Sequence, residues 1–286
     1  MRARGAKHSA TEEGAERSSA CTGRTGPEFS ASEALARLTR LGEQPPCIVL
    51  LGDSNSGKTT LANLLLGSRV LPTSAIPNTR FPMRVRHAET VGATAVSGDG
   101  RRSRIVKPFE ADDELPALLE IGLPTVRLKQ FEILDTPGGF TAAQGMALDG
   151  ISSLLIPVWC TSAPQAWKDS ERRAWIGQSR KLRRHALLAV TRMDFITTGN
   201  DRDRLFMRLR EEAGSHFDHI FGVPQARGEE DAQMEPVADL IARVAGLLQA
   251  RRRQAVERLR QRILRISGDP EKSELPPIEA GASSVE

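Results

Sequence analysis

The segment CIVLLGDSNSGKT, residues 47–59, determines the predicted fold. Its first part, CIVLL, is an unbroken apolar run, which is typical of a strand buried on both faces in a parallel sheet. The next part, GDSNSGKT, fits the phosphate-binding pattern GxxxxGK[ST], and the helical pattern TTLANLLLG overlaps its end. Because strand, glycine-containing loop and helix follow one another in the order that phosphate binding requires, their context makes the match specific.

The residues of this loop, 52–59, have distinct expected roles toward a bound triphosphate. Gly52 and Gly57 permit backbone conformations that turn N–H groups inward, and the helix directs the positive end of its dipole to the phosphates. Lys58 is expected to neutralise the β- and γ-phosphates, and the Thr59 hydroxyl to ligate Mg²⁺. An ordinary strand-to-helix turn is the alternative. The predicted nucleotide-binding residues here are Asp53, Ser54, Asn55, Ser56, Gly57, Lys58, Thr59 and Thr60.

A second motif, DTPG at residues 135–138, follows the apolar run FEIL. Ligands of open α/β sheets bind beyond the carboxyl ends of the strands, which is where this motif is expected to lie. Asp135 is predicted to hold Mg²⁺ through its water shell, and the Gly138 N–H to contact the γ-phosphate. Taken alone, DTPG is also a common turn.

A third motif, TRMD at residues 191–194, follows the run ALLAV and is close to the guanine-reading pattern [NT]KxD. A carboxylate at Asp194 can accept hydrogen bonds from N1–H and the exocyclic amine of guanine, whereas adenine has no donor at N1. Arg192 replaces the usual Lys, and its guanidinium can stack on the edge of the base. Thr191, Arg192 and Asp194 are therefore predicted to bind GTP rather than ATP, although a surface loop with a capping Asp is the alternative.

The rest of the chain predicts an α/β fold with a mainly parallel sheet flanked by helices, as in P-loop NTPases. Further apolar runs (FEIL, SSLLIPVW, ALLAV and FDHIFGV) alternate with helical stretches such as DSERRAWIGQSRKLRR at 169–184. The segment ATAVSGDGRRSRIV, residues 93–106, predicts an inserted β-hairpin. One domain is expected over 31–266, from a short helix near Ser32 to a long helix over about 236–266, with disordered tails at 1–30 and 267–286.

Composition excludes several classes of protein. With 39% apolar and 27% charged residues in 286, the chain is neither collagen-like nor fully disordered. The net charge of +4 is too small for a dedicated nucleic-acid-binding protein, so no nucleic-acid partner is expected. The sequence shows no signal peptide, no apolar run of membrane-spanning length and no metal or disulfide spacing among its three cysteines, so a cytoplasmic location is predicted.

With GDSNSGKT, DTPG and TRMD in this order, the chain resembles the dynamin and Era-like branch of the TRAFAC-class GTPases, and bacterial dynamin-like GTPases in particular. The resemblance covers residues from about 47 to 227 and implies a G domain over 31–266 that hydrolyses GTP with Mg²⁺ as its cofactor. By this resemblance LPTSAIPNTRFPMRV is switch I, whose Thr79 would join Thr59 and Asp135 in holding Mg²⁺, with Thr73 as a weaker candidate. Switch II would begin at Asp135 and run to about Gly145.

Departures from the family pattern also carry expectations. Gly139 stands where Ras-like enzymes have a water-positioning Gln, which predicts slow intrinsic hydrolysis. Asn55 has the position at which cation-activated members bind K⁺, so K⁺ is a second candidate cofactor, although an Asn here also tolerates a turn conformation. The predicted catalytic residues are Lys58, Asn55 and Thr79. A nucleotide-binding interaction protein with negligible hydrolysis is the alternative function.

The resemblance also implies partners. Besides GTP and GDP these are a nucleotide-dependent homodimer or a protein effector. The loop VPQAR at 223–227 has the position of a second guanine-contacting loop, with Gln225 in place of the usual Ser. The end of the long helix carries seven arginines but one Glu, so contact with a membrane surface is considered, though a solvated helix packed on the sheet is favoured.

Overall fold

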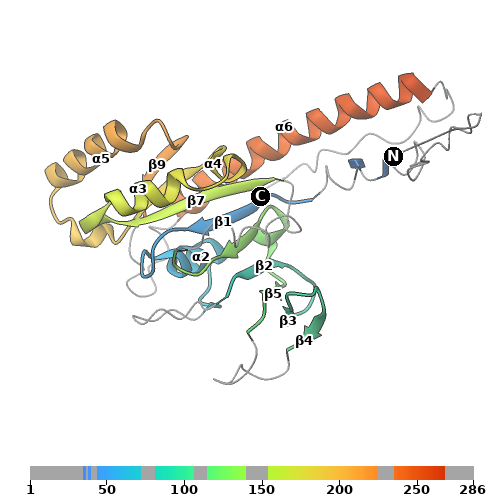
Figure 1. The fold of residues 1–286 in the computed structure, drawn as a ribbon, viewed down its shortest axis with the longest axis horizontal. Helices are drawn as coiled ribbons and strands as arrows, with labels where there is room; N and C mark the ends of the chain where they lie inside the picture. The colour runs from blue at the N-terminus through green and yellow to red at the C-terminus, as the bar shows by residue number, and fades with distance from the viewer. Residues whose placement is uncertain are drawn as a thin grey trace, which may run out of the picture.

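The computed structural model of the chain describes residues 35–36, 38–39, 44–71, 81–105, 115–139, 154–223 and 235–267. In these residues the predicted α/β architecture is confirmed: one mainly parallel sheet is flanked by helices (Figure 1). Several predicted features lie outside the described residues. These are the two tails, Thr73, Thr79, the switch II residues 140–145 and the loop residues 224–227.

Nine strands form the sheet of the described region, in the order β4-β3-β5-β2-β6-β1-β7-β8-β9. Strand β1 pairs in parallel with β6 on one side and β7 on the other, and Leu50 lies opposite Asp135. The carboxyl ends of these central strands therefore meet at one edge of the sheet, where the three motifs begin. The strands are β1 Cys47–Leu51, β2 Met83–His87, β3 Gly92–Val96, β4 Arg102–Arg104, β5 Leu118–Leu123, β6 Glu132–Asp135, β7 Leu155–Ser162, β8 Leu187–Thr191 and β9 His219–Gly222.

The helices form because apolar side chains at helical spacing pack against the two faces of the sheet. One core cluster joins Ile48 and Leu50 of β1 to α2 and α6, and the other joins Val49 to α3, α4 and α5. Alternate residues of β1 thus serve opposite faces, as its unbroken apolar run predicts. The α-helices are α2 Lys58–Leu66, α3 Asp169–Ile176, α4 Arg180–Arg183, α5 Gly199–Ala213 and α6 Glu235–Ser267, and the 3₁₀ helices are η1 Val126–Lys129, η3 Ala163–Gln165 and η4 Met193–Phe195.

Two secondary-structure predictions can be compared directly with the structure here. The hairpin is confirmed, because β3 and β4 pair antiparallel and β3 continues the sheet by pairing with β5. The single helical stretch predicted over 169–184 is wrong: α3 ends at Ile176, and α4 starts after Ser179, whose hydroxyl caps it by accepting from the Leu182 N–H. Strands β2 and β5 were not predicted from the sequence.

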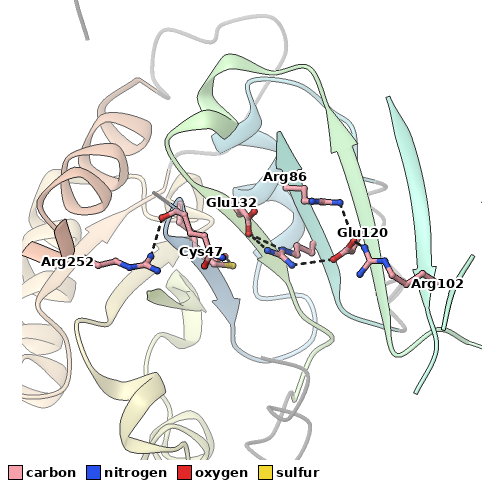
Figure 2. A network of polar contacts seen from close by, with 9 residues as sticks. Cys47, Arg86, Arg102, Glu120, Glu132 and Arg252 are labelled. Carbon is pink, nitrogen blue, oxygen red and sulfur yellow. Dashed lines mark hydrogen bonds and ion pairs between the residues drawn. The ribbon is translucent and has the colours of Figure 1, made fainter. Parts of the chain in front are cut away.

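The long C-terminal helix is confirmed as α6, which runs away from the sheet in Figure 1. Among the side chains of this helix that the structure describes, Arg252 donates to the Gln44 carbonyl at 3.2 Å (Figure 2), and Arg260 is buried and lies 3.7 Å from Glu257 of the same helix. Leu259 of the same helix is 48% exposed. The basic charge of this helix is therefore only partly at the surface. None of the described helices has the length and apolarity to cross a membrane.

A group of ion pairs, here called the arginine network, crosses β2, β4, β5 and β6 (Figure 2). Arg84 donates to Glu132 Oε2 from Nε at 2.9 Å and from Nη2 at 2.6 Å, and its Nη1 lies 3.3 Å from Glu120 Oε1. Arg86 and Arg102 also pair with Glu120, which is 5% exposed. Among the described residues Glu120 therefore pairs with three guanidinium groups, and Glu132 shares one of them, that of Arg84.

Candidate functional site

The phosphate-binding loop predicted at residues 52–59, here called the P-loop, connects β1 to α2. Gly52 has φ +131°, and a Cβ there would lie 2.3 Å from the Cys160 carbonyl oxygen of β7. Gly57 is the N-cap of α2 with φ +84°, and a Cβ there would lie 3.0 Å from Thr191 of β8. The loop is therefore packed so closely against two neighbouring strands that both positions require glycine.

Lys58 extends back across the P-loop. Its Nζ donates to the carbonyls of Gly52 at 3.1 Å and Asp53 at 2.6 Å, and the residue is only 5% exposed. Burial lowers the pKa of Lys58, while the electrostatic effects of Cys160 and of the Asp135 and Asp53 carboxylates act in the opposite direction. The cation predicted to meet the phosphates is thus held within the loop, bonded to backbone oxygens only.

The two described residues of the predicted magnesium set are in contact. Thr59 Oγ1 donates to Asp135 Oδ2 at 2.6 Å, across 76 residues of sequence. Asp135 is fully buried, and its Oδ1 has no hydrogen-bond partner within the described part of the chain. Burial raises the pKa of Asp135 to about 6, against the lowering effects of the Thr59 hydrogen bond and of the Lys58 charge. A buried carboxylate oxygen left unpaired beside a hydroxyl fits Mg²⁺, which prefers oxygen ligands.

The residues after Asp135 also contact the P-loop. Thr136 Oγ1 donates to the Leu50 carbonyl at 2.6 Å, and the Gly139 N–H donates to the Gly52 carbonyl at 3.3 Å. A Cβ on Gly138 would lie 2.2 Å from Ser54 Oγ, so only glycine fits against the P-loop here. The start of the predicted switch II therefore adjoins the loop that would hold the phosphates. The contact of the Gly138 N–H with a γ-phosphate stays a prediction.

The third motif is tied to the P-loop by two hydrogen bonds. Thr191 Oγ1 donates to the Ser56 carbonyl at 2.8 Å, and Arg192 Nη2 donates to the Asn55 carbonyl at 3.0 Å. Asp194 follows in η4 and is half-buried. The sequence places these residues at the end of β8, and the structure brings this end to the P-loop. Their contacts with a guanine base remain predictions.

Asn55 has φ +61°, in the left-handed region that Asn tolerates better than most residues. The turn conformation alone is therefore enough to explain an Asn at this position, without a bound K⁺. A role in binding K⁺ stays a prediction.

Sequence reasoning missed one contact of the P-loop. Lys168 Nζ lies 2.8 Å from Asp53 Oδ2, so the loop that follows β7 reaches the P-loop. Lys168 belongs to the segment CTSAPQAWKDSE, but no spacing or pattern in this segment marks it as a partner of Asp53.

Comparison with known proteins places this geometry in a family. The model of the Dynamin family matches residues 48–193, which is 146 of the 286 residues and runs from β1 to the third motif. The chain belongs to the dynamin family. The described sheet and helices accordingly have the fold of a P-loop GTPase domain.

Two bacterial relatives and one solved structure extend the comparison. The isoniazid-induced protein IniC of Mycobacterium tuberculosis is 32% identical over 142 residues, covering 44% of this chain and 28% of IniC. Dynamin-like protein 2 of Campylobacter jejuni is 22% identical over 200 residues, covering 66% of this chain and 32% of that protein. A structure described as an oligomerised bacterial dynamin pair for sensing and tethering membranes matches at 20% identity with a TM-score of 0.55, over 77% of this chain and 39% of that one.

The chain thus spans less than a third of the length of these curated relatives. At 20% identity the structural match supports the fold alone.

Proposed function

We propose that this dynamin-family domain binds GTP together with Mg²⁺ and hydrolyses it with water to GDP and phosphate. The observation that carries the proposal is the contact of Thr59 with Asp135 beside the buried ammonium of Lys58. The Thr59 hydroxyl, the Asp135 carboxylate with its one unpaired oxygen and the Lys58 ammonium thus lie together beside a glycine-containing loop. This set of groups suits a metal-bound triphosphate.

Different residues are proposed to bind the phosphates, the metal and the base. Lys58, the P-loop N–H groups and the start of α2 bind the phosphates, and Thr59 and Asp135, with Thr79, hold the metal. Mg²⁺ supplies positive charge against the β- and γ-phosphates when it is bound. Asp194 accepts from N1–H and the exocyclic amine of guanine, and the Arg192 guanidinium stacks on the base. The tie between Arg192 and the Asn55 carbonyl supports this placement, since it fixes the distance between the base-reading motif and the P-loop.

Hydrolysis is proposed to be slow and to be stimulated by K⁺. Gly139 has no side chain with which to orient the attacking water, and φ +73° there is a conformation that suits glycine. A missing charge stabiliser costs about 10³ to 10⁵ in rate. In this proposal K⁺ held at Asn55 supplies part of that charge.

Phosphate release tests the function. The measurement compares GTP with ATP in K⁺ and in Na⁺ buffers of equal ionic strength, with Lys58→Ala as the inactive control. GTP is expected to be hydrolysed in preference to ATP, and more quickly in K⁺. Equal rates with the two nucleotides would contradict the proposed substrate, and equal rates with the two cations would contradict only the role of K⁺.

A second candidate function is nucleotide binding with negligible hydrolysis, in which bound GTP mainly stabilises one conformation. The observation that favours it is again Gly139, which has no side chain in the place of the water-positioning Gln. Under this function the chain binds GTP tightly, and phosphate release stays at the background of the Lys58→Ala control under every condition.

We further propose that the domain pairs with a second copy across its nucleotide face, or binds a protein effector at that face. We also propose that it is a cytoplasmic protein found in part at a membrane surface. The family supports this proposal, and the matched bacterial dynamin pair is described as oligomerised and membrane-tethering. Phosphate release per molecule is expected to rise with protein concentration. A constant rate would contradict catalytic pairing of this chain.

A further inference from the structure

The ion pair between Lys168 and Asp53 joins the loop after β7 to the P-loop. The two side chains are 45% and 36% exposed, and the distance of 2.8 Å is that of a charge-assisted hydrogen bond. The hydrogen bond to Asp53 raises the pKa of Lys168, so its ammonium is charged at neutral pH. Neither the phosphate-binding pattern nor the guanine-reading motif uses Lys168.

The loop that carries Lys168 is held by buried groups beneath it. Trp167 is 4% exposed and has φ +58°, a conformation whose cost is about 1–3 kcal/mol for a residue other than glycine. The backbone N–H of Trp167 donates to Thr161 Oγ1 at 3.0 Å, and the Thr161 hydroxyl donates to Glu171 Oε2 at 2.8 Å. The Lys168 N–H also donates to Glu171 Oε2, at 3.2 Å, and the Trp167 ring packs edge-on against Phe217 with ring centroids 5.1 Å apart.

These contacts fix the loop whether or not the ion pair forms. An exposed ion pair stabilises a fold by only about 0.2–1 kcal/mol, which is less than the upper range of the Trp167 strain. The buried indole, the Thr161 hydroxyl and the Glu171 carboxylate must therefore hold the strained backbone. Lys168 is directed at Asp53 by this framework and contributes little to it.

Asp53 places a negative charge where it disfavours an anionic ligand. Its carbonyl accepts from Lys58 Nζ at 2.6 Å, so its position is coupled to that of the phosphate-binding cation. Its carboxylate belongs to the same loop and is partly exposed. Left without a counterion, this carboxylate would repel the phosphates and offset part of the charge of Lys58.

We propose that Lys168 is a positioning residue for the nucleotide: it neutralises and holds the Asp53 carboxylate, so that the P-loop presents the Lys58 charge to the triphosphate undiminished. This inference rests on the proposed GTP binding. Lys168 acts through Asp53 and not by contact with the phosphates, and this distinction is what the experiment measures.

The test is a cycle of the variants Lys168→Gln, Asp53→Asn and the double variant, with the dissociation constant for Mg²⁺·GTP measured by calorimetry. Lys168→Gln is expected to weaken binding about fivefold to tenfold, because it leaves an unpaired carboxylate in the loop. The double variant is expected to bind Mg²⁺·GTP more tightly than Lys168→Gln does, because the repelling charge is then gone as well. The KM for GTP should follow the dissociation constant while kcat stays constant.

Arg172→Gln is the matched control, since it also removes one positive charge, from α3, and breaks an exposed ion pair with Asp169 at 3.1 Å. It should change GTP affinity by less than about twofold. A double variant as weak as Lys168→Gln would overturn the inference in favour of direct phosphate contact, and Lys168→Gln equal to Arg172→Gln would also overturn it. In both results the unchanged chain still binds GTP, whereas absence of GTP binding by the unchanged chain overturns the proposed function itself.

Discussion

The P-loop region and the arginine network both bury charged side chains in the same sheet, but the buried charges have different kinds of partner in the two regions. In the network Arg84 contacts both Glu132 and Glu120, and Glu120 has further guanidinium partners. In the P-loop region Lys58 is bonded to backbone carbonyls alone, and Asp135 Oδ1 and Ser56 Oγ are buried without a hydrogen-bond partner in the described residues. Buried charges that pair with one another indicate a structural role, whereas an unpaired carboxylate oxygen beside a glycine-containing loop and a buried ammonium fits a bound metal and phosphate.

The largest expected effect comes from breaking the network. Arg84→Ala leaves two carboxylates buried with fewer partners, which should lower the free energy of unfolding by about 3–5 kcal/mol. Urea denaturation measures it, with Arg104→Ala on the exposed strand β4 as a control that should stay within about 0.5 kcal/mol. The GTP affinity of the folded protein should not change. A loss of affinity without a loss of stability would contradict the structural role of the network.

The second-largest effect is expected in the P-loop, where a substitution should lower GTP affinity and leave stability nearly unchanged. Lys58→Ala should weaken GTP binding by about 100-fold, or about 2.7 kcal/mol, because it removes the ammonium that faces the phosphates. The free energy of unfolding should not fall by more than about 1 kcal/mol, since a buried charge is removed with no charged partner left in contact. Calorimetry and urea denaturation measure the two quantities, and Lys129→Ala on the surface is the control. A destabilisation as large as that of Arg84→Ala would show that the two regions do not differ as described.

The smallest effect concerns pH. Burial raises the pKa of Asp135 from 3.8 to about 6, so the native chain binds this proton more tightly than the unfolded chain does. Ionisation of Asp135 therefore lowers the free energy of unfolding as pH rises from about 4 to about 6, and the cost is fully present above that range. Because the metal needs the ionised form, the Mg²⁺-dependent part of GTP affinity should be about tenfold weaker at pH 5 than at pH 7.5.

Asp135→Asn should remove this pH dependence, since the amide does not titrate. Affinities of the unchanged chain and the variant at the two pH values, with and without Mg²⁺, provide the measurement. A Mg²⁺ contribution that is equal at both pH values in the unchanged chain would exclude Asp135 as the metal-holding group.

How much the sequence could predict also differs between the two regions. The P-loop motif is local: its glycines, lysine and threonine stand at fixed spacing between an apolar run and a helix, so the loop, the strands β1, β6 and β8 and the helix α2 were predictable. Placing both motifs at the carboxyl edge of one sheet predicted that Thr59 and Asp135 serve the same metal, but not their direct hydrogen bond. Lys168 could not be found in this way, because its contact with Asp53 depends on the strained backbone at Trp167 and on tertiary packing.

The arginine network was missed together with its strands, although a signal was present. In β2, MRVRH alternates apolar Met83 and Val85 with Arg84 and Arg86, and this alternation is typical of a strand. The alternation also suggests that the arginines are solvent-exposed, whereas Arg84 is largely buried by its carboxylate partners. Which carboxylates these are depends on the register of β2 with β5 and β6, and the sequence alone does not supply that register.

The central claim is that this domain recognises a guanine nucleotide. The most direct test of it replaces the side chain that would accept hydrogen bonds from the base. Asp194→Asn presents an amide donor where the carboxylate accepted, so it should lose affinity for GTP and gain affinity for XTP, whose base has a carbonyl in place of the exocyclic amine. The measurement is the ratio of the dissociation constants for GTP and XTP, for the unchanged chain and for the variant. We predict that the unchanged chain prefers GTP and that the variant reverses the preference. The same ratio in both proteins, or no preference in the unchanged chain, would contradict the account.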